Sequence, residues 1–331
     1  YRMNNNYTRQ EIEDQPGVWE NLINNPPRLE EILDKDNVIF FGSGTSHYLA
    51  LSAASFTQHY TGIVSRGLPS QEIAFFPEAT MPDRDTLYVG ISRSGETSEV
   101  VIATETIKER GKGNIIGITT EIDKPLAKLA ERSIVIGEAK EKSVVMTKSF
   151  TSMLLAIQLG VLSTVNPSAI DTMKDEFGRS SRKVMTIAEA WAKGEAKNNY
   201  KEIIFLGSGP LYGIACESAL KVREMSASTA TAFHSLEFRH GPKASLTKDS
   251  FVVILISDSA REEELKIAKE IEDVGSKCTI IGYDLPLSLS EFLRMILYMP
   301  FSQYLGYYKA LEKGINPDTP INLTRVVRIE E

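Results

Sequence analysis

The sequence predicts an α/β protein made of two tandem, doubly wound parallel-sheet domains followed by a C-terminal tail. Short apolar runs alternate with segments of helical periodicity along the chain. This alternation is typical of parallel strands connected by helices that cover both faces of a sheet. Similar landmarks also return at a fixed distance in the second half. The length of 331 residues is sufficient for two domains of ordinary size.

Six apolar runs are predicted to be strands, three in each half of the chain. A segment with helical periodicity follows them, for example Ser98–Glu109. The predicted strands are Asn37–Phe41, Thr86–Ile91, Asn114–Ile118, Lys201–Leu206, Phe251–Ile256 and Cys278–Tyr283.

Three pairs of matching positions share one offset, which indicates an internal duplication. Glycine after a first strand is common in doubly wound folds, but it does not explain why three landmarks have the same spacing. The pairs, each 165 residues apart, are Gly42 and Gly207, Ser92 and Ser257, and Gly117 and Gly282. We expect an N-terminal helical segment (1–35), a first domain (36–166), a connecting helix (167–198), a second domain (199–312) and a tail (313–331).

Composition and charge exclude several classes of function. The net charge of −7, from 37 basic and 44 acidic residues, argues against a general nucleic-acid binder. Cys216 and Cys278 give neither a disulfide framework nor the spacing of a zinc site. No apolar run reaches the roughly 18 residues of a membrane-spanning helix, and the polar start does not resemble a signal peptide. We therefore expect a soluble, cytoplasmic protein without a metal, cofactor or membrane partner.

The turn after the strand Thr86–Ile91 has the composition of a phosphate site. Ser92, Ser94 and Thr97 supply hydroxyl donors just before a helix, whose first N–H groups and positive dipole end favour an anion. Gly95 allows close approach of the backbone. The alternative is plain N-capping by Ser94 or Thr97, but one hydroxyl is sufficient for a cap.

The matching turn of the second half has lost this composition. Gly95 is replaced by Ala260, and Asp258 and Glu262 introduce negative charge. Only the first half is therefore predicted to bind phosphate.

The turn after the first strand, Gly42–His47, is a weak match to a dinucleotide fingerprint because His47 stands where the third glycine belongs. We interpret Thr45 and Ser46 as hydroxyls that face a substrate at the carboxyl edge of the sheet.

The turn SRSGET and several other segments resemble the sugar-isomerase (SIS) domain family. From end to end the chain is similar to the isomerase half of glucosamine-6-phosphate synthase, which implies two flavodoxin-like domains. The other matching segments are RQEIEDQP (Arg9–Pro16), VVMTKSF (Val144–Phe150), ESALKVRE (Glu217–Glu224), LEFRHGP (Leu236–Pro242) and GINPDTPINL (Gly314–Leu323).

The resemblance implies roles for particular residues. Glu224 matches the glutamate that moves a proton between C1 and C2 of the open-chain sugar, although a glutamate on a helix is by itself more often only solvated. His240 matches the histidine that opens the sugar ring from the neighbouring subunit. We expect the polar stretch Ala227–Arg239 before it to be irregular and flexible enough to carry this histidine across a two-fold interface. Lys221, one turn before Glu224, can set its pKa or hold a sugar hydroxyl. Val144 matches a substrate-binding position of the family loop.

The sequence departs from the family at several of these positions. Arg325 stands where the synthase has a catalytic lysine that forms an imine with the ketose, and arginine cannot form one. Ile321 replaces a tail arginine, and Met146 replaces a loop serine. Arg93 replaces the usual glutamine and is expected to be an additional phosphate partner. No segment resembles the glutaminase domain.

The resemblance therefore implies an enzyme that acts on a phosphorylated sugar and works as a homodimer with shared active sites. The preferred hypothesis is an amino-sugar-phosphate isomerase and deaminase, interconverting glucosamine-6-phosphate with fructose-6-phosphate and ammonia. The alternatives are a fructosamine-6-phosphate deglycase and a non-catalytic sugar-phosphate-binding regulator. The presence of both Glu224 and His240 argues against the regulator.

Overall fold

A computed structural model describes residues 6–282, 285, 288–326 and 329, so Tyr283, the end of one predicted strand, lies outside the described residues. The chain divides into two compact units that are interleaved in the sequence. The β1–β5 unit comprises residues 17–141, 148–175 and 324–331. The β6–β9 unit comprises residues 1–16, 142–147 and 176–323. The five-segment division expected from the sequence stays a prediction.

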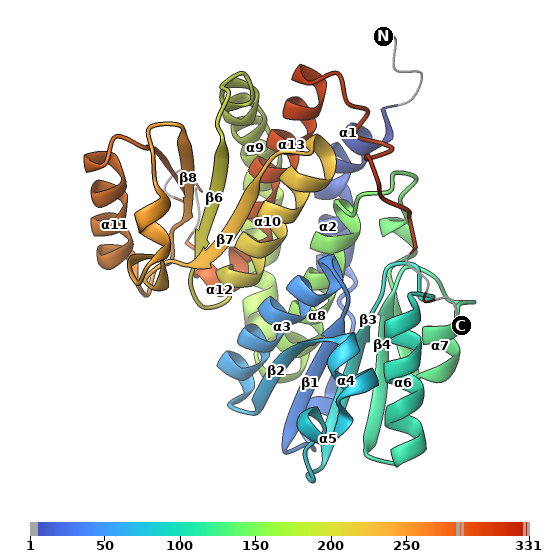
Figure 1. Cartoon of the computed structure of the whole chain (residues 1–331). Helices are drawn as coiled ribbons and strands as arrows, with labels where there is room; N and C mark the ends of the chain where they lie inside the picture. Colours follow the sequence, from blue (N-terminus) through green and yellow to red (C-terminus); the bar gives the residue numbers. More distant parts are fainter. Residues whose placement is uncertain (1–5, 283–284, 286–287, 327–328, 330–331) are drawn as a thin grey trace. The chain divides into compact units, whose positions relative to one another are not determined.

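The β1–β5 unit contains a five-stranded parallel sheet in the order β2-β1-β3-β4-β5. Figure 1 shows helices on both faces of this sheet. Its strands are β1 (Asn37–Gly42), β2 (Val64–Pro69), β3 (Thr86–Ile91), β4 (Gly113–Thr119) and β5 (Arg132–Val135). Its helices are α2 (Gln15–Asn24), η1 (Glu30–Ile32), α3 (Thr45–Thr61), α4 (Ser70–Phe75), α5 (Pro77–Thr80), α6 (Ser98–Arg110), α7 (Pro125–Leu129), η2 (Gly137–Ala139) and α8 (Lys148–Val165).

The β6–β9 unit repeats the same topology with one strand fewer, in the order β7-β6-β8-β9. The long helix α9 (Pro167–Ala196) runs from one unit into the other. The strands are β6 (Glu202–Gly207), β7 (Ala230–His234), β8 (Ser250–Leu255) and β9 (Lys277–Ile281). The helices are α1 (Tyr7–Glu13), α10 (Leu211–Ser226), η3 (Glu237–Arg239), η4 (Pro242–Ser245), α11 (Arg261–Asp273), α12 (Glu291–Arg294), η5 (Met295–Tyr298) and α13 (Met299–Glu312).

These two sheets confirm the predicted fold class. In the central strands β1, β3 and β8 every residue is buried, because helices cover both faces of each sheet. One face of the first sheet packs Ile39 and Tyr88 against Ile73 of α4 and Val100 of α6. Burial on both faces requires continuous apolar runs, and this is why the sequence indicated these strands.

The sequence did not indicate β2, β5 and β7, which lie at the edges of the two sheets. These three strands are only partly buried and lack a continuous apolar run, and in β2 the pattern is further interrupted by Gly67 and Pro69. The edge strand β9 keeps an apolar run and was predicted. The prediction that 227–239 is an irregular stretch was wrong. This stretch contains β7, which pairs with β6 in parallel, and the 3₁₀ turn η3.

Gly42 and Gly207 occupy equivalent places at the ends of β1 and β6. A Cβ on Gly42 would lie 2.6 Å from the backbone and side chain of Ser46, in the first turn of α3. A Cβ on Gly207 would meet the backbone of Leu211, the first residue of α10. The helix after the first strand of each sheet therefore requires glycine at this position.

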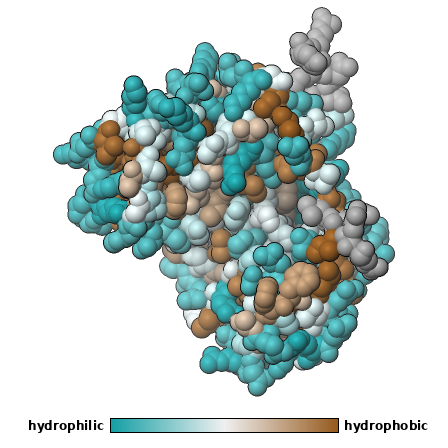
Figure 2. All heavy atoms as spheres, viewed as in Figure 1, coloured by the Kyte–Doolittle hydropathy of each residue, from teal (hydrophilic) through white to brown (hydrophobic). Residues whose placement is uncertain are grey.

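Helix α8 is long and apolar enough to cross a membrane by length and composition, but 83% of it is buried inside the structure. Core helices pass the same test, and α8 packs against α3 within its unit. The face of the molecule in Figure 2 is mostly hydrophilic, with separate hydrophobic patches. Exposed large side chains such as Phe75, Phe76 and Trp191 are compatible with an ordinary protein surface.

Candidate functional site

The topology of the first sheet predicts where a ligand binds. The strand order reverses between β1 and β3, and in open α/β sheets ligands bind outside the carboxyl ends of the strands at such a switch point. Because β1 and β3 pair in parallel, with Phe41 opposite Gly90, the turns that follow them share one edge. Thr45 and Ser46 follow β1, and both are largely buried in the first turn of α3.

The phosphate turn (Ser92–Thr97) follows β3 and is held by its own side chains. The Ser92 hydroxyl accepts a hydrogen bond from Gly95 N at 3.0 Å, and it lies 3.2 Å from the Thr97 hydroxyl. The Ser94 hydroxyl accepts from Glu96 N at 3.3 Å. The turn therefore gathers the three predicted hydroxyls before the first residue of α6.

These hydroxyls do not cap α6, which was the alternative interpretation of the turn. Thr97 is the N-cap residue, yet its side chain makes no capping hydrogen bond. Gly95 has a φ of +67°, a backbone conformation that favours glycine. Its carbonyl accepts from Leu126 N at 2.9 Å, which anchors the turn. The start of α6 keeps the features of an anion site.

In the second turn (Ser257–Glu262), Ser257 binds a carboxylate from the helix that follows. Glu264, fully buried, accepts hydrogen bonds from Ser208 Oγ at 2.8 Å, Ser257 N at 2.7 Å and Ser257 Oγ at 2.9 Å. Asp258, one of the two carboxylates noted in the sequence, is paired with Arg294 at 2.6 Å. Glu262, the other, is exposed. The carboxylate that contacts the serines is therefore Glu264, which sequence reasoning missed.

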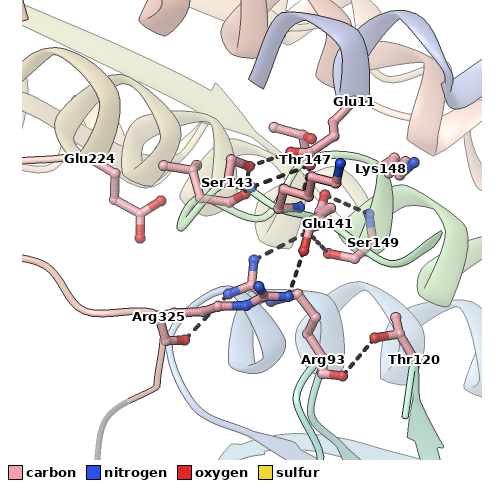
Figure 3. Close-up of polar contacts among 12 residues, drawn as sticks. Glu11, Arg93, Thr120, Glu141, Ser143, Thr147, Lys148, Ser149, Glu224 and Arg325 are labelled. Atoms are coloured by element: carbon pink, nitrogen blue, oxygen red, sulfur yellow. Dashed lines mark hydrogen bonds and ion pairs between the residues drawn. The ribbon is translucent and has the colours of Figure 1, made fainter. Parts of the chain in front are cut away.

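Arg93 lies inside a buried network of the β1–β5 unit rather than on an open surface (Figure 3). Its Nη1 is 3.2 Å from Glu141 Oε2, and its Nη2 donates to the carbonyl of Arg325 at 3.3 Å. Arg325 in turn donates from Nη2 to the Glu141 carbonyl at 2.5 Å. Ser149 donates to the Glu141 carboxylate from N at 3.0 Å and from Oγ at 2.6 Å. The charge of Arg93 is thus matched by Glu141, and its predicted role as a phosphate ligand stays a prediction.

Glu224 and Lys221 lie on α10 in the β6–β9 unit. Lys221 Nζ is 2.5 Å from Glu224 Oε2 and 3.1 Å from Glu217 Oε1, one turn further back. Lys221 and Glu217 are fully buried, whereas the Glu224 side chain is 20% exposed. Burial lowers the pKa of Lys221, but the two carboxylates outweigh this and raise it above its usual value. The lysine is therefore a permanent cation that orients a partly accessible carboxylate.

His240 lies at the end of η3 and is exposed. Within the described part of the chain its imidazole has no hydrogen-bond partner, and the exposed ring is therefore accessible to another molecule. Cys216, on α10, is partly buried, and burial raises the pKa of its thiol to about 11. A neutral thiol of this kind is a poor nucleophile.

The segment that contains Val144 is fixed from several sides within the β6–β9 unit. Glu11 of α1 accepts from Lys142 N at 2.5 Å and from the Ser143 hydroxyl (Figure 3). Val144 N donates to the carbonyl of Asp318 at 3.3 Å. The Asp318 carboxylate accepts from Thr8 N and Thr8 Oγ1, both at 2.7 Å. The loop that resembles the family's substrate loop is thus held in place by α1 and by the tail.

Sequence reasoning missed Glu141, Glu217 and Glu264, three buried acids that organise the sites described above. Glu217 was visible as the first residue of the ESALKVRE segment, one turn before Lys221. Glu141 and Glu264 gave no local signal, because their partners are distant in sequence or lie across a turn. The searched, described residues contain no cluster of three or more His, Cys, Asp or Glu side chains suited to a metal.

The model of the SIS domain matches residues 31–163 and 198–301. Among curated relatives, the glutamine–fructose-6-phosphate aminotransferase (isomerizing) of Sulfurisphaera tokodaii is 29% identical over 316 residues, covering 91% of this chain and 51% of the relative. The enzyme of the same name from Pyrococcus horikoshii is 28% identical, covering 97% of this chain and 57% of the relative. The chain thus spans about half the length of the curated relatives it matches.

Solved structures with the same fold match nearly the whole chain. A glucosamine-6-phosphate deaminase from Thermotoga maritima is 30% identical with a TM-score of 0.87, covering 97% of this chain and 99% of that one. A tagatose-6-phosphate ketose/aldose isomerase from Escherichia coli has a TM-score of 0.82 at 24% identity, covering 100% of this chain and 98% of that one. At that identity the second likeness concerns the fold alone.

Proposed function

This chain belongs to the SIS domain family, and we propose that it is a sugar-phosphate isomerase and deaminase acting on an amino-sugar 6-phosphate. The proposed reaction interconverts glucosamine-6-phosphate and water with fructose-6-phosphate and ammonia. The family membership confirms the resemblance inferred from the sequence motifs. The name of the Thermotoga maritima relative, which is 30% identical over almost its full length, supports the amino-sugar substrate.

The observation that carries the proposal is the position of Glu224. Its carboxylate is partly exposed, while Lys221 and Glu217 behind it are fully buried. Lys221 stays charged and holds one carboxylate oxygen at 2.5 Å, which leaves the other oxygen able to exchange a proton. A general acid/base requires such a carboxylate, held in one orientation and open on one side.

In the proposed mechanism Glu224 removes the C2 proton of the open-chain aldose while O1 takes up a proton, which gives an enolamine between C1 and C2. The same carboxylate returns the proton to C1 while the amine nitrogen loses one proton, so that C2 becomes an imine. Water adds to this imine, and ammonia leaves with formation of the C2 ketone. His240 moves the proton between the ring oxygen and O1 when the sugar ring opens. No electrons enter or leave, so the chemistry requires no redox cofactor.

We propose that the substrate's phosphate binds to Ser92, Ser94 and Thr97. These hydroxyls do not cap α6, and the helix start offers N–H groups and a positive dipole end. Thr45 and Ser46 follow the neighbouring strand of the switch point and are proposed to contact the sugar. Val144 is proposed to do so through its fixed loop.

We propose that the enzyme forms no imine between its tail and the substrate. Arg325 replaces the lysine that would form an imine, and its guanidinium is bound to the Glu141 carbonyl. Arg93 supplies positive charge beside the phosphate turn, balanced by Glu141. Direct contact between either arginine and the phosphate is part of the proposal.

We further propose that the working enzyme is a cytoplasmic homodimer in which His240 serves the partner's site. The support is the exposed imidazole of His240, which has no hydrogen-bond partner among the described residues. The flexible segment expected before it is not part of this support, because β7 occupies most of that stretch. Two cysteines without a disulfide agree with a reducing compartment.

Incubation with a panel of phosphorylated amino sugars and fructosamines tests the function. Release of ammonia and fructose-6-phosphate from glucosamine-6-phosphate is the expected result. Release of an amino acid from a fructosamine-6-phosphate, without ammonia from glucosamine-6-phosphate, would favour a deglycase. If every substrate binds without turnover and without solvent-deuterium exchange, the protein is a sensor rather than an enzyme.

A further inference from the structure

The internal repeat places a glutamate at equivalent positions after both turns, but only the second glutamate binds the serines of its turn. Glu99 and Glu264 are 165 residues apart, the offset that also relates Ser92 to Ser257 and Ser43 to Ser208. In the second turn Glu264 binds both serines through three hydrogen bonds of 2.7–2.9 Å. This carboxylate accepts from the hydroxyl and N–H donors whose equivalents in the first turn are proposed to bind a ligand.

Glu99 does not make the equivalent contacts in the first turn. Its Oε2 is buried and has no hydrogen-bond partner within the described residues. The Ser92 hydroxyl accepts from Gly95 N, as the Ser257 hydroxyl accepts from Ala260 N, but its second contact is the Thr97 hydroxyl rather than a carboxylate. A buried carboxylate oxygen without a donor is unfavourable, so Glu99 is held away from the serines by the structure around it.

The difference between the turns begins at one residue. Gly95 has a φ of +67°, and α6 begins at Ser98. Its counterpart Ala260 has a φ of −114°, and α11 begins at the next residue, Arg261. In the common numbering of the repeat, α11 therefore begins two residues earlier than α6. The earlier start carries Glu264 to a different place on its helix, where it reaches Ser208 and Ser257.

We propose that Glu99 is a tethered competitor of the substrate's phosphate, kept out of the turn by the left-handed conformation of Gly95. In the other conformation, that of the second turn, its carboxylate would bind Ser43 and Ser92 and exclude a like-charged phosphate. In that conformation the attached carboxylate would compete at a high effective concentration, so the turn accepts a phosphate only while Gly95 keeps Glu99 away. Glu99 is thus a specificity-determining residue, and this inference rests on the proposed phosphate site.

The test measures binding of fructose-6-phosphate by calorimetry to the wild type, Gly95→Ala, Gly95→Asn, Glu99→Gln and the double variant Gly95→Ala/Glu99→Gln. Alanine disfavours the left-handed conformation, whereas asparagine tolerates it and adds the same Cβ, so Gly95→Asn is the matched control. We expect Gly95→Ala to weaken binding by about tenfold or more and the double variant to recover most of the loss, since residues in one network couple. Gly95→Asn should bind more tightly than Gly95→Ala, and Glu99→Gln alone at least as tightly as the wild type.

The outcomes separate the inference from the phosphate site itself. If the wild type does not bind fructose-6-phosphate, or if Thr97→Glu binds it unchanged, the proposed phosphate site is wrong. If the wild type binds but the double variant is as weak as Gly95→Ala, strain alone explains the loss and the tethered competitor is refuted. If circular dichroism shows that Gly95→Ala does not fold, a second pair of variants tests the inference. Thr97→Glu blocks the first turn, and Thr97→Glu/Glu264→Ala also removes the carboxylate from the second turn. If the double variant binds inorganic phosphate more tightly than Thr97→Glu, the inference is supported, and equal binding overturns it.

Discussion

Glu224, Lys221 and Glu217 form a line of alternating charge along about two turns of α10. Their order from buried to accessible gives each a separate task. Glu217 balances the charge of the buried Lys221. Lys221 binds and orients the Glu224 carboxylate, and Glu224 is partly exposed to solvent. Removing the buried cation would leave the fully buried Glu217 without the charge that balances it.

Replacing Glu224 by glutamine removes the proposed acid/base while Lys221 keeps Glu217 as partner. We expect substrate binding to persist and proton transfer to fall by about 10²–10⁴-fold. Solvent-deuterium exchange at C1 or C2 of the sugar phosphate measures this step. Glu262→Gln, on the exposed side of α11, is the matched control and should exchange like the wild type. Exchange at the wild-type rate in Glu224→Gln would mean that another base acts.

Replacing Lys221 by methionine leaves the buried Glu217 without its cation, and we expect a loss of about 3–5 kcal/mol in the free energy of unfolding. The folded pKa of Lys221 is raised, so its contribution is complete below the unfolded value of about 10.4 and is lost as pH rises through the folded pKa. Urea unfolding at several pH values should therefore show the difference between wild type and variant shrinking above about pH 10.4. A constant difference up to pH 12 or an unchanged stability at pH 7 would contradict this assignment.

At the scale of elements, Arg325 of the tail is bound to Glu141 and to Arg93 of the phosphate turn. Glu141 binds Arg93, Ser149 and Arg325, which come from a turn, a helix and the tail of one compact unit. Three segments distant in sequence thus meet at one residue: the Glu141 carboxylate binds Arg93 and Ser149, and the Glu141 backbone carbonyl binds Arg325. The tail is an ordered part of this unit at Arg325, rather than a free end.

The tail should carry no imine with a ketose phosphate. Arg325 cannot form one, and the raised pKa of Lys221 keeps that amine protonated and therefore non-nucleophilic. Borohydride treatment with fructose-6-phosphate, followed by peptide mass spectrometry, should find no adduct on the tail or on Lys221. Arg325→Lys is the comparison in which a tail adduct becomes chemically possible. An adduct on any wild-type lysine would show that the protein uses imine chemistry after all.

At the scale of the whole molecule, the duplication has given two turns of one design with separate tasks. In the second turn Ser257 binds the carboxylate of Glu264, whereas the first turn is the proposed phosphate site. Only one phosphate site per chain is therefore expected. The proposed exchange of His240 between subunits adds a second requirement, because a single chain then lacks one group of the reaction.

Mixing two inactive variants tests the shared site. In a dimer of Glu224→Gln and His240→Ala subunits, one of the two sites receives both wild-type groups if His240 crosses the interface. Activity should then return to a measurable fraction of the wild type. If each site is built from one chain, mixing restores nothing, provided that exchange of labelled subunits is shown under the same conditions.

The fold could be predicted because it depends on patterns that repeat along the chain. The central strands β1, β3 and β8 are buried on both faces, which forces continuous apolar runs. The edge strands β2, β5 and β7 escaped prediction because their composition is mixed, whereas the edge strand β9 keeps an apolar run and was predicted. These segments form strands because they pair with a neighbouring strand in the folded sheet.

The sequence by itself determined the duplicated α/β architecture, the phosphate turn and the place of Glu224 and Lys221 on one helix face. These features follow from local composition, from the period of a helix or strand and from the 165-residue offset. Only the tertiary structure decided that Glu141 binds both Arg93 and Arg325, and that Glu264 rather than Glu262 enters the second turn. The physical reason is that a buried charge is stable only beside partners that satisfy it, and those partners are chosen by the packing of distant segments.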